Sequence, residues 1–276
     1  ESNPFHASQT AFPTDTEQTF GVDLRTQVNG VTIAAEPDGV VDDSGTHFIN
    51  IPSLLTSRDN VRQGAANLLT LRKSLGSIVN AATQSFVPVD TSRVGLIAHS
   101  LGGMVAIPYL GVETTPTPSS IVMSGATITK VLQDSVNFAP VVAQGLAAVG
   151  VVTPEAVAEF YANAQVIIDA GEPANYAAAA AANHPIHLIE VIGDETVPNS
   201  STENLANIMG ANSISTTTPG IAPGNTGIVR FTAGDHSSPL SPAASRAATL
   251  EIQSQLAVFQ ATSGTIIKIT DGNVIQ

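Results

Sequence analysis

The segment Arg93–His99, with the sequence RVGLIAH, constrains the fold of this chain most. Its apolar residues follow one another directly, which is typical of a strand buried on both faces of a parallel sheet. Three similar segments follow it, at Ser119–Gly125, His187–Asp194 and Gly227–Asp235. Because helical patterns separate these segments, the sequence predicts an α/β fold with a mostly parallel sheet flanked by helices.

Apolar residues at helical spacing fill the gaps between the predicted strands. A helix with one apolar face is predicted to begin at Ser57, and a short helix covers Ser201–Gly210. Ser241 and Pro242 are typical of a helix N-terminus and predict the start of the last helix. Its buried stripe is expected to consist of Ala248, Ile252, Leu256 and Phe259.

The first 50 residues are polar and rich in turn-forming residues. Short strands are predicted at Thr19–Leu24 and Val31–Ala35. The acidic stretch Glu36–Gly45 lacks the Asp-x-Asp-x-Asp-Gly spacing of a calcium-binding loop, so we interpret it as a solvated turn.

The segment Ala126–Asn183 interrupts the alternation of strands and helices. It contains only helical patterns, is rich in Ala and Val, and precedes the strand His187–Asp194. Such an insertion is either additional core or a cap over a site, and we favour a helical cap or lid. Because no interdomain linker is evident, residues 1–276 are predicted to form a single domain that contains this cap.

The composition excludes several classes of function. The net charge of −13 argues against nucleic acid and anionic membrane surfaces as partners, because both require a basic patch. The chain has no cysteine, which excludes disulfides, thiolate metal sites and cysteine nucleophiles. No apolar run is long enough for a transmembrane span, and the first ten residues do not have the pattern of a signal peptide.

Three predicted strands are each followed by a residue that can take part in acyl transfer: Ser100, Asp194 and His236. In an open parallel sheet, the carboxyl ends of the strands form the site. A serine hydroxyl needs a base to accept its proton, and a histidine suits that task near neutral pH. A buried carboxylate fixes the imidazole tautomer. The sequence therefore predicts Ser100 as nucleophile, His236 as base and Asp194 as acid.

The residues around Ser100 are consistent with a sharp strand-to-helix turn that exposes its hydroxyl. We expect small residues to be required two positions before and two positions after the serine, where Ala98 and Gly102 stand. Gly103 would allow the new helix to pack on the sheet. The backbone N–H of Leu101 is predicted to be one donor of the oxyanion hole, whereas the second donor is not identified.

Other titratable residues have weaker claims. Asp235 is adjacent to His236 but is directed away from it in the predicted turn. His184 and His187 form a His-x-x-His pair without a third ligand, so we interpret both as structural and predict no metal site. His99, beside the nucleophile, is expected to pack rather than react.

The motifs AHSLGG, VIGDETVPN and FTAGDHSSPLSPAAS together resemble the extracellular lipases of the bacterial virulence-factor lipase family, which belong to the α/β-hydrolase superfamily. The segment GTHFINIPSLLTSRDNVRQ also resembles the stretch that these lipases carry ahead of the nucleophile. The resemblance extends from about Phe20 to the C-terminus. It implies the same three catalytic residues, Ser100, Asp194 and His236, and a secreted or cell-surface enzyme that acts on lipids.

The sequence departs from this family in one respect. α/β-Hydrolases place several strands and a His-Gly motif before the nucleophile, and the loop of that motif supplies the second oxyanion donor. This chain has no His-Gly pair. Our hypothesis is that the chain is the C-terminal part of a longer precursor, whose upstream segment would complete the sheet.

These observations predict a serine carboxylester hydrolase, a lipase or esterase that works through an acyl-enzyme and needs no cofactor. The alternatives are a phospholipase or polyester hydrolase with the same triad, a serine peptidase, and a catalytically impaired fragment that binds lipid. The cap would contact the acyl chain and a lipid interface. The last residues, 264–276, predict a strand and a turn that pair at a sheet edge or serve an oligomer contact.

Overall fold

The computed structural model describes residues 23–24, 26–28, 31–34, 36–42, 47–50, 53–80 and 82–276. The chain divides into two compact units, Glu1–Asn50 and Ile51–Gln276. Each unit is described by itself below.

The described part of the first unit contains an antiparallel pair of strands, β1 (Thr26–Val28) and β2 (Val31–Ala34). β2 confirms the second predicted strand. Of the first predicted strand, residues 19–22 lie outside the described residues, and Asp23 is not in a strand. Instead, the Asp23 carboxylate accepts hydrogen bonds from the backbone N–H groups of Asp38 (3.0 Å) and Gly39 (2.8 Å). The described residues of the acidic stretch therefore form a turn.

The second unit is built on a parallel sheet of five strands, which confirms the predicted α/β class. Every neighbouring pair of strands in this sheet is parallel. In spatial order the strands are β3 (Leu96–His99), β4 (Ser119–Val122), β5 (Ile186–Val191), β8 (Gly227–Phe231) and β6 (Asn212–Ser213).

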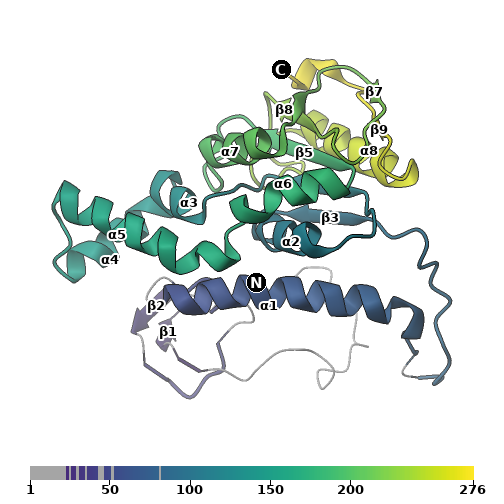
Figure 1. Ribbon diagram of the computed structural model, residues 1–276. Coiled ribbons are helices and arrows are strands. Elements are labelled where there is room, and N and C mark those ends of the chain that lie inside the picture. Colours follow the sequence, from purple (N-terminus) through teal and green to yellow (C-terminus); the bar gives the residue numbers. More distant parts are fainter. Residues whose placement is uncertain are drawn as a thin grey trace. The chain divides into compact units, whose positions relative to one another are not determined.

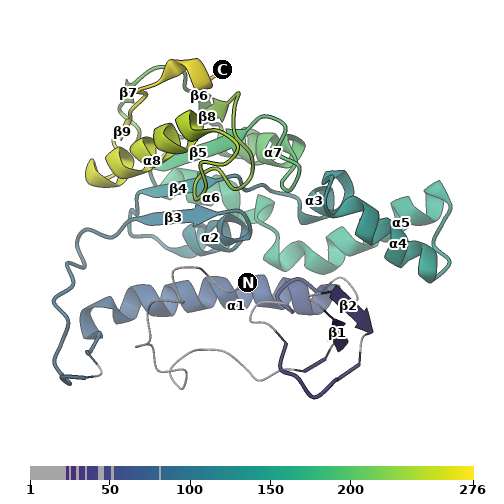
Figure 2. The same ribbon diagram turned by 180° about the vertical axis from the view of Figure 1, so that it is seen from behind.

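Helices cover both faces of this sheet (Figures 1 and 2). Alternate residues of a strand point to opposite faces, so each strand contributes to two separate cores. Ile121, Leu188 and Ile228 pack with the helices α1 (Leu54–Ser74), α2 (Leu101–Val112), α6 (Ala174–Asn183) and α7 (Asn199–Met209). Their neighbours Val122, Ile189 and Val229 pack with α8 (Arg246–Ala261) on the other face.

The segment predicted as a cap contains four helices between β4 and β5. The first three are α3 (Ile128–Asp134), α4 (Ala139–Ala148) and α5 (Pro154–Ile168), and both views show α4 and α5 away from the sheet (Figures 1 and 2). The fourth helix, α6, differs from these three. Its buried alanines, Ala177, Ala180 and Ala181, belong to the same core as α2, so α6 is part of the layer that covers the sheet.

The carboxylate of Glu172, which is fully buried, joins the beginning of the insertion to the residues just before α6. It accepts hydrogen bonds from the backbone N–H groups of Thr127 (2.6 Å) and Ile128 (2.8 Å), at the beginning of α3. Those first-turn N–H groups have no acceptor within the helix, so this carboxylate caps α3 from a distance in sequence of more than 40 residues.

Three predictions about the elements were wrong. β3 is not buried on both faces, because it forms one edge of the sheet that the described residues build, and Ile97 is 52% exposed. α8 does not begin at Ser241 and Pro242 but at Arg246, because Ser245 caps it by accepting a hydrogen bond from Ala248 N–H. α1 begins at Leu54 rather than at Ser57, which is instead buried within its first turn.

The C-terminal residues pair with strands of the second unit. β9 (Ile266–Ile267) pairs in antiparallel fashion with β7 (Thr218–Pro219), and Ile275 forms a bridge to Phe231 of β8. The predicted terminal strand therefore pairs within the chain. Three short 3₁₀ helices complete the second unit: η2 (Leu75–Ser77), η3 (Asp169–Gly171) and η4 (Gly272–Val274). Among the helices that the structure describes, none is both long enough and apolar enough to cross a membrane.

Candidate active site

Ser100 lies at a sharp turn between β3 and α2. Its backbone has φ 56° and ψ −125°, a combination that side chains other than glycine rarely adopt. Such a conformation costs about 1–3 kcal/mol and persists only where the surrounding structure enforces it. Here the N–H of Ser100 donates to Val122 O (2.9 Å), and its carbonyl accepts from Gly103 N–H (2.9 Å). The turn is thus fixed to β4 on one side and to the first turn of α2 on the other.

The prediction that Gly103 allows the helix to pack on the sheet is confirmed, whereas the prediction for Gly102 was wrong. A Cβ atom on Gly102 would have open space around it. A Cβ on Gly103 would lie 2.5 Å from the side chain of Ser124 and 3.1 Å from that of Ile121, so Gly103 is needed for α2 to approach β4. Ala98, the small residue before the serine, is buried as expected.

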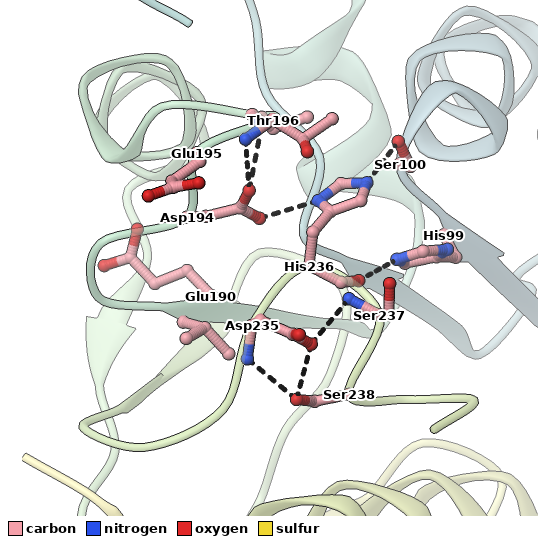
Figure 3. A network of polar contacts seen from close by, with 12 residues as sticks. His99, Ser100, Glu190, Asp194, Glu195, Thr196, Asp235, His236, Ser237 and Ser238 are labelled. Atoms are coloured by element: carbon pink, nitrogen blue, oxygen red, sulfur yellow. Dashed lines mark hydrogen bonds and ion pairs between the residues drawn. The ribbon is translucent and has the colours of Figure 1, made fainter. Parts of the chain in front are cut away.

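The structure brings the three predicted residues into one hydrogen-bonded row (Figure 3). His236 Nε2 is 2.8 Å from Ser100 Oγ, and His236 Nδ1 is 2.7 Å from Asp194 Oδ2. Because a carboxylate only accepts, Nδ1 donates to Asp194, which leaves Nε2 free to accept the proton of the serine hydroxyl. The row joins the carboxyl ends of β3, β5 and β8.

Leu101, the predicted oxyanion donor, is the first residue of α2. The first N–H groups of a helix have no acceptor within the helix, and such groups can bind an anion. The position of Leu101 is thus consistent with a donor role beside Ser100.

The Asp194 carboxylate is oriented by hydrogen bonds from backbone N–H groups of its own loop. Asp194 Oδ1 accepts from the N–H groups of Thr196 (2.8 Å) and Val197 (3.0 Å), while the other oxygen faces His236. Asn199, at the start of α7, accepts from Gly193 N–H (2.7 Å) and donates to the carbonyl of Val191 (2.8 Å). These bonds fix the carboxylate in the orientation that the histidine needs.

The helical insertion is attached to the same loop. Between α3 and α4, Ser135 Oγ donates to Glu195 O (3.0 Å), and Asn137 Nδ2 donates to Thr196 Oγ1 (2.9 Å). Asn137 N–H also donates to Glu195 O (3.2 Å). The insertion therefore makes direct hydrogen bonds to the residues that follow Asp194.

A second buried carboxylate, Glu190, lies on β5 four residues before Asp194. Its partners are Arg230 Nε (3.1 Å) and Asn199 Nδ2 (3.0 Å). Arg230 also donates to both carboxylate oxygens of Glu203, at 2.6 and 2.8 Å. Burial raises the pKa of Glu190 to about 7, with Glu203 adding to the rise, whereas Asn199 and Arg230 oppose it. The hydrogen bond from Arg230 lowers the pKa of Glu203.

The other titratable residues considered as candidates for the site form hydrogen bonds with backbone groups instead. The Asp235 carboxylate accepts from Ser237 N–H (2.9 Å) within its own turn. His184 uses both ring nitrogens on backbone groups, accepting from Thr117 N–H (3.0 Å) and donating to Leu110 O (2.8 Å). Within the part of the chain that the structure describes, no cluster of three or more His, Cys, Asp or Glu side chains could hold a metal ion.

The sequence did not predict three side chains that form hydrogen bonds with the Asp194 loop: Asn199, Ser135 and Asn137. Each makes its contact through hydrogen bonds to a loop whose course depends on the whole sheet, so no local pattern marks it. For Asn199 a weak signal did exist, because it closes the motif VIGDETVPN, on which the resemblance rested.

No protein-family profile matches this chain, and no curated protein does. Among solved structures, a puromycin-hydrolyzing peptidase from Mycobacterium tuberculosis is similar with a TM-score of 0.46 and 14% identity, over 73% of this chain and 25% of that one. An acylaminoacyl peptidase from Pyrococcus horikoshii is similar with a TM-score of 0.44 and 13% identity, over 76% of this chain and 29% of that one. This chain thus spans between 25% and 29% of the length of these two peptidases. The likeness concerns the fold alone.

Proposed function

We propose that this protein is a serine carboxylester hydrolase in which Ser100 is the nucleophile, His236 the base and Asp194 the acid. One observation carries the proposal: the imidazole of His236 lies 2.8 Å from a serine hydroxyl on one side and 2.7 Å from a buried carboxylate on the other. This is the arrangement that activates a serine for acyl transfer.

In the proposed reaction, Ser100 Oγ attacks the ester carbonyl carbon while His236 Nε2 accepts the hydroxyl proton. The N–H of Leu101 donates to the developing oxyanion. The tetrahedral intermediate then expels the alcohol, which takes the proton back from His236, and an acyl ester remains on Ser100. Water attacks this ester as His236 accepts one of its protons, and the carboxylic acid leaves as the serine is restored. Asp194 stabilises the imidazolium in both halves.

The surface of the insertion supports a lipid ester as substrate. No Asp, Glu, Lys or Arg occurs from Ser135 to Thr153, although the whole chain has a net charge of −13. Val136 and Val149 in this stretch are 62% and 75% exposed. Exposed apolar surface of this kind is typical of a site that contacts lipid or protein. The proposal therefore extends to a lipase, secreted or attached to the cell surface of a bacterium, as the resemblance of the three motifs implies.

A fluorophosphonate probe tests the catalytic role, because it phosphonylates only an activated serine. We expect stoichiometric labelling of the wild-type protein and none of Ser100→Ala, with the label mapped to Ser100 by peptide mass spectrometry. If the folded wild-type protein is not labelled, the proposal fails. In that case a lipid-binding module without catalysis becomes the better description.

A series of p-nitrophenyl esters tests the substrate class. Burial of each additional methylene contributes about 0.8 kcal/mol, so a lipase is expected to gain in kcat/KM as the acyl chain lengthens. A preference for acyl chains of roughly four carbons or fewer would contradict the lipase assignment and leave a short-chain esterase.

The substitution Val149→Asp tests the apolar surface of the insertion directly. Because Val149 is exposed, the fold should tolerate the charge, and we expect slower hydrolysis of emulsified esters with unchanged hydrolysis of a soluble ester. Leu250→Asp on α8 is the control outside the insertion, since Leu250 is also an exposed apolar residue (50%), whereas Val149 lies in the turn directly after α4. Equal effects of the two substitutions would contradict a specific contact with lipid.

A further inference from the structure

His99 makes a contact with the backbone of the proposed base. It is the last residue of β3, directly before Ser100, and its Nε2 atom is 2.9 Å from the carbonyl oxygen of His236. Figure 3 shows the side chain of His99 directed to this carbonyl, beside the row of Ser100, His236 and Asp194. Because a carbonyl oxygen only accepts, Nε2 of His99 carries a proton and donates it.

This hydrogen bond fixes the loop after β8, which extends across the end of the sheet from β8 to β3. His236 lies in residues 232–245, which form neither helix nor strand and which follow β8. In the sheet, β5 and β4 separate β8 from β3, so the loop extends over about 14 Å, three strand spacings, to reach Ser100. Further along the loop, Gln253 of α8 donates to Pro239 O (3.0 Å). His99 supplies the anchor on the side of the nucleophile.

The two imidazole rings also face each other. Their centroids are 4.8 Å apart and their planes are inclined by 38°. Both nitrogens of the His236 ring are engaged, by Ser100 and Asp194. The His99 ring therefore packs against a side chain whose rotation is already limited, and it restricts the remaining freedom of that side chain.

The charge state of His99 suits this position. Burial lowers the pKa of His99, and the hydrogen bond to the His236 carbonyl opposes this shift without reversing it. A neutral His99 places no positive charge beside the imidazolium that forms on His236 during acyl transfer.

We propose that His99 is a positioning residue: its Nε2–H bond to the His236 carbonyl ties the base-bearing loop to the nucleophile-bearing strand and holds His236 Nε2 within reach of Ser100 Oγ. This inference rests on the proposed function, because it assigns His99 a part in the same reaction. It is compatible with the expectation that His99 packs rather than reacts, because the ring packs against His236.

Two amide substitutions of His99 distinguish the loss of the hydrogen bond to the His236 carbonyl from a change in the polarity of the side chain. In His99→Gln the side-chain Nε2 lies about where the histidine Nε2 lies, so it can donate to the same carbonyl. In His99→Asn the amide is one methylene shorter and does not reach. Both side chains are neutral and polar, so any difference between them reports the bond itself.

We expect kcat of His99→Asn on a soluble ester to fall about tenfold to a hundredfold, the cost of misplacing a catalytic group by about 1 Å. KM should stay close to the wild-type value, because no contact with substrate is removed. The rate of fluorophosphonate labelling should fall in parallel with kcat. His99→Gln should recover most of both rates, and a residue that only supports the fold would not produce this pattern.

The outcomes are distinguishable from failure of the proposed function. If wild-type protein is not labelled, the proposed function fails. If wild type is labelled and His99→Asn retains the wild-type kcat and labelling rate, the positioning role is wrong. It is also wrong if His99→Gln loses as much kcat as His99→Asn, or if both variants lose activity only in proportion to a lower melting temperature.

Discussion

Two buried carboxylates lie four residues apart at the same end of β5, and their surroundings differ. The Asp194 side chain is 2% exposed and that of Glu190 is 3% exposed. Asp194 accepts two backbone N–H bonds and faces a histidine that contacts a serine hydroxyl. Glu190 faces an arginine that is already paired with a second carboxylate.

Under the proposed function, the Asp194 network takes part in the reaction and the Glu190 network is structural. Burial is the same in both, so burial alone does not mark the site. The Asp194 network ends at a hydroxyl that can gain and lose a proton, whereas the Glu190 network ends at a guanidinium that stays charged. Substitutions in the first network should therefore act on catalysis, and substitutions in the second on stability.

The largest expected effect is that of Ser100→Ala. Loss of the nucleophile should lower kcat by about a millionfold, because the acyl-enzyme can no longer form. The free energy of unfolding should change little, since the backbone conformation at residue 100 is kept. Ester hydrolysis and urea unfolding of the same preparation measure both quantities. Substantial residual turnover that a serine probe does not inhibit would place the reaction elsewhere.

Asp194→Asn should have the next largest effect on catalysis. The amide keeps the size of the side chain but no longer fixes the imidazole tautomer, and the expected loss in kcat is about ten-thousandfold. Steady-state kinetics with a soluble ester, set against Glu190→Gln as the matched control, measures this loss. A loss of similar size in both variants would erase the distinction between the two networks.

Arg230→Met should act on stability instead. It leaves Glu190 buried without its cation and removes the pair with Glu203, but Glu190 already has a pKa of about 7 and can bind a proton instead, so the cost is about 1–2 kcal/mol. Urea unfolding at about pH 8 measures the cost, which should shrink at about pH 5, where Glu190 is protonated. The kcat of the folded fraction should be kept, because the bonds of Asp194 remain. A variant as stable as the wild type would show that Glu190 does not depend on Arg230.

Glu190→Gln should act on stability in the opposite direction, and its effect should depend on pH. The pKa of Glu190 is raised to about 7 in the folded protein from an ordinary value of 4.5. The folded state thus binds more protons than the unfolded state between these values, and the free energy of unfolding falls as the pH rises through this window. Without the carboxyl, the free energy of unfolding should no longer fall by about 1–3 kcal/mol across this pH window. Urea unfolding of both proteins at several pH values tests this. Parallel pH curves for the two proteins would contradict the raised pKa.

The sequence predicted one of the two networks, that of Asp194, but not that of Glu190. The apolar strands and the residues at their ends predicted the sheet and the positions of Ser100, Asp194 and His236, because strand ends gather at one edge of a parallel sheet. Glu190 was hidden within an apolar strand, and nothing local indicated that Arg230 would lie opposite it. Their pairing depends on the register between β5 and β8, which a single sequence does not reveal.

Two further expectations failed for physical reasons that only packing shows. A side chain at residue 102 was expected to clash, but the space around a Cβ there is open. Only Gly103 faces β4, as predicted, since the direction of α2 decides which residue meets the sheet. The segment Ala126–Asn183 was expected to act as one cap. Ala177, Ala180 and Ala181 of α6 pack in the core instead, because small side chains allow α6 to approach α2 closely.

The long crossing of the loop after β8 has a consequence for how the protein reaches its active form. Ser100 and His236 are 136 residues apart in the chain, and the strands between them pair in parallel. Contacts of such separation form late, because the entropy of closing the chain must be overcome before they stabilise anything. During refolding, helices such as α1 should regain their signal in circular dichroism first. Under the proposed function, recovery of ester hydrolysis should lag behind, so an activity assay would time the last step of assembly.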